Sequence, residues 1–108
     1  MSNEDRLYTA LAAVTQCDHL AMDGEPNEAA VYRFAREDGL YESDALIMAW
    51  DVFDVHIYQR EYVEARVDAC AEALAGAGFT VTRRGGEAME NGYYRFALEA
   101  RRRREQDE

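Results

Sequence analysis

The sequence predicts an α+β fold, with three to four helices packed on a small sheet that includes a C-terminal antiparallel hairpin. Apolar residues recur at helical spacing over much of the first half, whereas two segments near the C-terminus alternate apolar and polar residues as strands do. The 108 residues, 48% of them hydrophobic, suffice for one domain with its own core. We therefore expect a single compact domain over residues 1–98, followed by a charged C-terminal tail over 99–108.

Two helices are expected in the first part of the chain. Residues 4–22 carry apolar side chains at spacings of three and four, and Asn3 is a suitable N-cap for them. The residues at 23–26 include glycine and proline, and they predict a turn. The second helix is expected over 27–38, where Gly39 would end it in the left-handed conformation.

The segment after Ser43 supports two interpretations. We favour a short helix at 44–50 followed by a strand at 52–58, because the latter residues are rich in β-branched and aromatic side chains and alternate in polarity. The alternative is one helix from 44 to 58, since the apolar residues also fit a helical stripe. The residues of that stripe are Leu46, Trp50, Phe53 and Ile57.

The second half has the clearer pattern. Residues 60–76 predict a long amphipathic helix that ends in the Ala-Gly-Ala-Gly segment at 75–78. Residues 79–84 and 93–98 alternate apolar and polar side chains, and we expect them to pair as an antiparallel hairpin. If 52–58 is a strand, the order here is strand, helix, strand, strand, with a right-handed crossover for a parallel pair.

The chain is strongly acidic. It has 22 aspartates and glutamates against 12 arginines and no lysine, for a formal net charge of −10. Twelve of the acids but only three of the arginines fall within residues 1–58. Such an asymmetry favours an acidic surface that contacts a partner, and it does not by itself indicate a reaction. The absence of lysine is compatible with a GC-rich bacterial, phage or salt-loving archaeal source.

The sequence favours a cytoplasmic location without a membrane partner. The longest uninterrupted apolar run is Ala45–Trp50, far shorter than the about 20 residues of a membrane span. The first residues lack the basic start of a secretion signal. The two cysteines, Cys17 and Cys70, are then expected to stay reduced as small core residues.

The cysteines and histidines do not form a recognisable catalytic or metal motif. Cys17 and His19 would diverge on a helix, and His56 and Cys70 lie far apart in the sequence, unlike the paired ligands of a structural zinc site. Neither cysteine has the electropositive surroundings of an activated thiol. We expect no catalytic residue, no metal, no cofactor and no enzymatic activity; a deep pocket joining His56 to Cys70 would favour an enzyme instead.

The candidate site is an acidic stripe on the helix expected at 60–76. Four acids fall along one face at i, i+3, i+7 and i+11, although like charges four residues apart disfavour a helix by about 0.2–0.5 kcal/mol per pair. We predict that this face docks a protein partner with a basic surface, and a merely solvated face is the alternative. The expected partner-binding residues are Glu61, Glu64, Asp68 and Glu72, with Tyr62 as an aromatic contact.

The leading hypothesis is a small acidic protein that binds another protein without catalysis, such as a phage or bacterial regulator or inhibitor. A homodimer is compatible with so small a domain. The alternative is a helix-turn-helix transcriptional regulator that uses residues 31–54, because Gly39 and the leucine after it have a spacing typical of that motif. Asp44 and Asp51 on the expected recognition helix would repel phosphates, so nucleic acid is not the expected partner.

Overall fold

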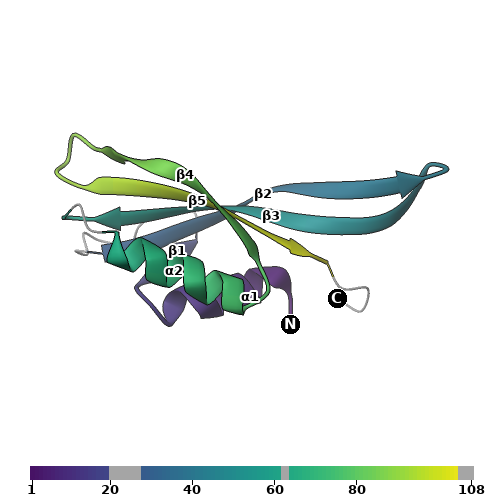
Figure 1. The fold of residues 1–108 in the computed structure, drawn as a ribbon, viewed down its shortest axis with the longest axis horizontal. Coiled ribbons are helices and arrows are strands. Elements are labelled where there is room, and N and C mark those ends of the chain that lie inside the picture. Colours follow the sequence, from purple (N-terminus) through teal and green to yellow (C-terminus); the bar gives the residue numbers. More distant parts are fainter. Residues whose placement is uncertain (20–27, 62–63, 105–108) are drawn as a thin grey trace.

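The computed structural model describes residues 1–19, 28–61 and 64–104. Within these ranges it contains two helices and one five-stranded sheet (Figure 1). The expectation of three to four helices on a small sheet is therefore wrong, because the fold is mostly sheet. In chain order the elements are α1 (Asn3–Ala12), β1 (Cys17–His19), β2 (Glu28–Glu42), β3 (Ala45–Gln59), α2 (Ala65–Gly76), β4 (Thr80–Ala88) and β5 (Tyr94–Arg103).

The sheet has the strand order β1-β2-β3-β5-β4, in which β1 is parallel to β2 and all other neighbours are antiparallel. Because β5 lies between β3 and β4, these two strands run in the same direction, and α2 connects them. The expected order of strand, helix, strand, strand is confirmed, with β3 covering 52–58 and the last two strands overlapping 79–84 and 93–98. β5 extends through Arg103, so residues 99–103 of the expected tail belong to the sheet.

The start of the chain is less helical than expected. The helix predicted over 4–22 ends at Ala12, and β1 follows it. The cap of α1 is Ser2, whose hydroxyl accepts a hydrogen bond of 3.1 Å from the backbone N–H of Asp5, whereas Asn3 is buried. The turn expected at 23–26 lies outside the described residues.

A long β-hairpin replaces the helices predicted for the middle of the chain. The helix expected over 27–38 is wrong, because these residues lie in β2 from Glu28 onward. The helix at 44–50 and its alternative, one helix from 44 to 58, are both wrong, because these residues form β3 from Ala45 onward. The helix-turn-helix interpretation of 31–54 is wrong for the same reason.

Two local features make this hairpin hard to recognise from its sequence. Ala35 is a bulge, since the pairing register with β3 shifts between Phe34 and Arg36. An extra residue breaks the two-residue alternation of a strand and leaves apolar side chains at helix-like spacing. The connecting turn consists of Ser43 and Asp44, with φ angles of 52° and 66°. This is a two-residue turn with positive φ at both positions, where asparagine and glycine are the usual signals.

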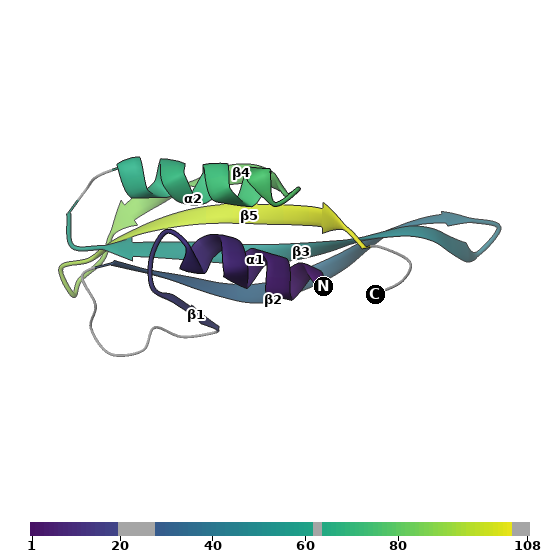
Figure 2. The same ribbon diagram turned by 90° about the horizontal axis from the view of Figure 1, so that it is seen from below.

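Both helices cover the same face of the sheet (Figure 1, Figure 2), and the core lies between them and the strands. Side chains alternate along a strand, so every second residue of β3 and β5 faces the helices. Burial of each large apolar side chain contributes about 1.5–3 kcal/mol relative to exposure. The largest fully buried side chains are Phe53, Leu7, Leu11, Ile57, Leu74, Leu98, Val52, Val55 and Cys70.

The distal end of the β2–β3 hairpin extends beyond the rest of the sheet (Figure 1), and the molecule measures 51 × 23 × 22 Å along its principal axes. β1 pairs with β2 only as far as Tyr32, and β5 pairs with β3 only as far as Trp50. We call residues 39–48 the arm. No strand among residues 1–19, 28–61 and 64–104 pairs with either outer edge of the arm.

Candidate functional site

The acidic stripe predicted on residues 60–76 is shorter than expected. α2 begins at Ala65, with Glu64 at the N-cap position, so Glu61 precedes the helix. Tyr62 lies outside the described residues. The acids that remain exposed at intervals of four residues are Glu64, Asp68 and Glu72.

Arginines neutralise this acidic face only in part. Arg83 on β4 forms an ion pair with Asp68. Arg66 instead pairs with Glu28 and donates a hydrogen bond to the carbonyl of Val14, so it does not reach the stripe. Glu64 and Glu72 form no ion pair with another described residue. The acidic face of α2 therefore keeps a negative potential, although one of its three acids is neutralised.

Both cysteines are buried in the core as free thiols, as predicted. Burial raises the pKa of Cys17 to about 12, with a smaller contribution from the negative charge of Asp18. Burial likewise raises the pKa of Cys70 to about 11. Neither thiol is an activated nucleophile, because activation requires a lowered pKa and access to solvent.

The two histidines lie on opposite faces of the sheet, and His19 shares the face of β1 that carries Cys17. The ring of His19 stacks on Tyr32, with 4.9 Å between the ring centroids. His56 lies on the sheet face opposite the helices, where burial and then the positive charge of Arg95 lower its pKa. No group of three or more His, Cys, Asp or Glu side chains that could hold a metal ion gathers within the described part of the chain.

The sheet face opposite the helices carries arginines and acids that neutralise one another. Arg101 also places its guanidinium carbon 4.8 Å from the ring centroid of Trp50, in a cation–π contact. The described residues of this face therefore form no large field of a single sign. The ion pairs are Arg33–Asp54 at 3.1 Å, Arg36–Asp38 at 3.1 Å and Arg84–Glu99 at 2.9 Å.

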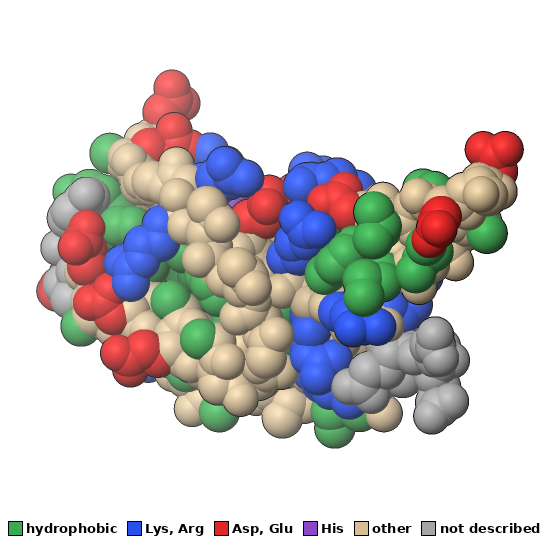
Figure 3. Space-filling view, turned by 45° about the vertical axis from the view of Figure 1, so that its right-hand side comes forward, with side chains coloured by type: hydrophobic (Ala, Val, Ile, Leu, Met, Phe, Trp, Pro, Cys, Tyr) green, Lys and Arg blue, Asp and Glu red, His purple; other side chains and the backbone are tan. Residues whose placement is uncertain are grey.

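The arm differs from every other described part of the surface in its apolar content. Among the described residues, seven large hydrophobic side chains are exposed, and four of them belong to the arm. Figure 3 shows hydrophobic side chains grouped next to a group of arginines. The arm residues and their exposed fractions are Leu40 (50%), Tyr41 (62%), Leu46 (48%) and Ile47 (44%).

The apolar side chains occupy both faces of the arm. Tyr41 is paired with Leu46 across the hairpin, and the next pair, Leu40 with Met48, points to the opposite face. Gly39 makes room on the first face, because a Cβ atom there would lie 2.9 Å from Leu46 Cδ1 and 3.0 Å from the ring of Tyr41. Tyr41 and Leu46 therefore pack over a glycine and leave their outer surfaces to solvent.

The arm and its base differ in how their charges are paired. The arm contains the acids Glu42 and Asp44 and no arginine. Neither acid forms an ion pair with another described residue. Arginines lie where the arm joins the sheet, including Arg33 and Arg36 on β2 and Arg101 on β5. The hairpin therefore runs from a base in which arginines and acids are paired to an acidic tip.

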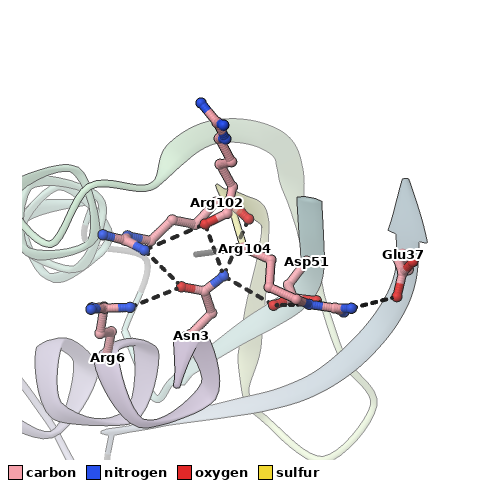
Figure 4. A network of polar contacts seen from close by, with 7 residues as sticks. Asn3, Arg6, Glu37, Asp51, Arg102 and Arg104 are labelled. Carbon is pink, nitrogen blue, oxygen red and sulfur yellow. Dashed lines mark hydrogen bonds and ion pairs between the residues drawn. The ribbon is translucent and has the colours of Figure 1, made fainter. Parts of the chain in front are cut away.

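A polar network around the buried side chains of Asn3 and Asp51 joins the base of the arm to the helical layer (Figure 4). Asn3 donates a hydrogen bond of 2.9 Å to Asp51, and its carbonyl oxygen accepts one of 2.9 Å from Arg102. Arg104 pairs with Asp51 and, at 2.8 Å, with Glu37. These contacts join α1, the end of β5 and both strands of the hairpin, so the arm leaves a rigid base.

The sequence contains a signal for the arm that the prediction of helices passed over. Ala45–Trp50 is an uninterrupted apolar run, and a strand with such a run is typically buried on both faces. In the structure the first three residues of this run are exposed. The first part of this run, residues 45–47, therefore has neither covering layer among the described residues.

No protein-family model matches the sequence, and no curated protein matches it. No described helix has the length and apolar character needed to cross a bilayer. The candidate site consists of two parts: the arm, because its apolar side chains are exposed, and the acidic face of α2, because its charge is only partly neutralised.

Proposed function

We propose that this chain is a small non-enzymatic protein that works by binding another protein through its arm. The observation that carries this proposal is the exposure of apolar side chains on both faces of the arm, with Leu40 on one face and Tyr41 and Leu46 on the other. Grouped apolar area of this kind marks a contact surface on a protein in water. Covering it is favourable by about 25 cal/mol per Å².

The charges of the arm favour a partner with a basic surface. Glu42 and Asp44 lie at the tip, exposed and without a positive neighbour in the arm itself. A partner strand with apolar side chains flanked by arginines would cover the apolar residues and pair with both acids.

The acidic face of α2 adds a second, electrostatic contact to this proposal. Its three acids lie on the side of the helix opposite the buried residues of α2. Exposed charges of this kind raise the rate of association more than the affinity, and added salt weakens their effect.

The contribution of the arm is tested by affinity capture from a lysate of the source organism. The test variant is Leu40→Ser combined with Tyr41→Ser, which removes apolar area from both faces. Tyr8→Ser is the matched control, because Tyr8 is 47% exposed on α1, outside the arm. We expect a protein, or a differently tagged copy of this chain, to be retained by the wild type and the control and lost with the arm variant. Equal retention by all three proteins would refute the proposal.

The contribution of the acidic face is tested separately on the captured partner. Glu64→Lys combined with Glu72→Lys reverses two charges and leaves the Asp68–Arg83 pair intact. Glu90→Lys, on an exposed acid between β4 and β5, is the control. We expect slower association for the α2 variant and a weaker dependence of its association rate on salt. If both variants associate at the same rate, the acidic face is only solvated.

A further inference from the structure

We propose that the protein bound by the arm is a second copy of this chain, joined edge to edge along β2 in an antiparallel, two-fold symmetric pair. This inference rests on the proposed function, because it names the occupant of the same arm. It makes the chain a homodimer in which the β2 strand of each arm pairs with the β2 strand of the other copy.

The first argument is the free edge of β2. β1 pairs with β2 only at residues 30–32, so the outer edge of residues 33–42 has no strand beside it among the described residues. A long exposed edge with apolar side chains is a ready template for another strand. Backbone N–H and C=O groups at such an edge form regular ladder hydrogen bonds once a strand is added.

The second argument is that this edge is complementary to itself. Antiparallel pairing of two identical strands sets the start of each strand against the end of the other. The start of the free edge carries Arg33 and Phe34, and its end carries Tyr41 and Glu42. A second copy therefore brings arginine to glutamate and phenylalanine to tyrosine, twice in one symmetric interface.

The bulge at Ala35 makes these pairs meet on the correct faces. Without an extra residue, Arg33 and Glu42 would point to opposite faces, because they are separated by an odd number of positions. With the register shift, Arg33 lies on the face that also carries Glu42, while Phe34 shares the other face with Tyr41. The register of the hairpin thus supplies the self-complementarity that a two-fold pair requires.

The centre of the proposed pair lies at Asp38, where the two copies bring like charges together. In each copy this charge is offset by Arg36 at 3.1 Å and by Arg101 at 3.8 Å. Arg33 and Arg36 have side chains that are 65% and 51% exposed, so both can reach a second acid. The pairing therefore does not leave a carboxylate without a counter-charge.

Pairing along β2 also covers apolar side chains of that strand. A fully covered aromatic side chain buries about 150–250 Å², so the half-exposed Phe34 and Tyr41 offer on the order of 200 Å² per copy. Leu40, on the same strand, is 50% exposed and adds to this area. Leu46 and Ile47 lie on β3, away from the pairing edge.

The test is a charge-swap experiment read by sedimentation equilibrium and by light scattering after size-exclusion chromatography. The variants are Glu42→Arg, Arg33→Glu, the two combined, and Glu90→Arg as a control outside the interface. We expect the wild type and the control to dimerise at micromolar concentration. Each single swap should raise the dissociation constant by about tenfold or more, because it sets like charges together. The combined variant should restore dimerisation, since it re-forms both pairs with reversed signs.

Circular dichroism and thermal unfolding of each variant show that the fold is kept, and rescue by the combined variant excludes misfolding as the cause. A wild type that stays monomeric, or a dimer that none of the swaps weakens, would overturn the inference. If the wild type is monomeric and Leu40→Ser with Tyr41→Ser still abolishes capture of another protein, the second copy is excluded and the proposed function stands. If neither dimerisation nor capture depends on the arm, both fail.

Discussion

The side-chain amide of Asn3 donates a hydrogen bond of 2.9 Å to the carboxylate of Asp51 and so joins the first turn of α1 to the base of the arm. Asn3 is 2% exposed and Asp51 is 8% exposed, so both groups have left water. The amide nitrogen also lies 3.3 Å from the carbonyl oxygens of Arg102 and Arg103. A buried carboxylate and a buried amide each need such partners, because an unpaired polar group in the interior is costly.

Replacing Asn3 with alanine should destabilise the protein by about 1–3 kcal/mol, because Asp51 and Arg102 would each lose a buried hydrogen-bond partner. The free energy of unfolding is measured by urea denaturation. Asn91→Ala is the control, since Asn91 is exposed and its side chain accepts one hydrogen bond from the Tyr93 backbone. An equal effect of the two substitutions would show that the Asn3–Asp51 contact does not stabilise the fold.

The second half of the chain could be predicted from its sequence because local pattern and tertiary structure agree there. Val67, Cys70 and Leu74 recur at helical spacing and are the buried residues of α2. Phe96 and Leu98 lie two positions apart, between Arg95 and Glu99, and are buried in β5. Such periodicities arise because one face of a helix or strand is buried. The helix and the strand inferred from them are therefore confirmed as α2 and β5.

The first half could not be predicted because long-range pairing overrides its local pattern. The bulge at Ala35 interrupts the alternation of β2, and the turn at Ser43 and Asp44 has neither the asparagine nor the glycine that marks most two-residue hairpins. A helix over these residues is consistent with the local spacing, and only the partner strand excludes it. Asn3 fits an N-cap by type, yet it is buried and bonded to a residue 48 positions away.

The acids of α2 could be predicted from helical spacing, whereas the arm could not be predicted as a site. From the sequence alone, the run Ala45–Trp50 indicates only that this segment is too short to span a membrane. Its place in the arm follows from the strand register. Exposure of its side chains depends on where β5 ends, opposite Trp50, which no local pattern in β3 reports.

Gly86→Ala should destabilise the protein, whereas Gly76→Ala should not. A Cβ atom at Gly86 would lie 2.8 Å from the ring of Phe96, which is buried in the core and cannot move aside freely. We expect a loss of about 1–3 kcal/mol from this overpacking. Gly76 is the last residue of α2, and a Cβ there meets nothing within 4 Å. Its replacement should be neutral or stabilising by up to about 1 kcal/mol, because alanine favours the helix.

Both glycine variants are measured by thermal and urea unfolding, and neither lies in the arm, so dimerisation should be unaffected. A stable Gly86→Ala protein would show that the ring of Phe96 shifts without cost. Destabilisation by Gly76→Ala would show that the end of α2 does not tolerate the side chain.

The substitution His56→Gln should reduce the loss of stability on mild acidification. Burial and the positive charge of Arg95 lower the pKa of His56 below its ordinary value of 6.5. The unfolded chain therefore takes up a proton at a higher pH than the folded chain does, so stability falls as the pH decreases from about 6.5 through the folded pKa. Thermal midpoints of the wild type and the variant at about pH 7.5 and 5.5 measure this difference. The same drop in both proteins would mean that the carboxylates alone cause the acid sensitivity.

Both thiols should be unreactive toward a disulfide reagent in the native protein near pH 8 and reactive after unfolding in denaturant. The raised pKa values, about 12 for Cys17 and about 11 for Cys70, leave almost no thiolate at that pH, and both side chains lie in the core. Cys17 is 9% exposed and Cys70 is 0% exposed, so a slow native reaction should begin at Cys17, through local opening of the short strand β1. The absorbance of the released thiol gives the rate, and Cys17→Ala should remove the faster phase. Reaction of either thiol within the mixing time would show that the helical layer does not seal this part of the core.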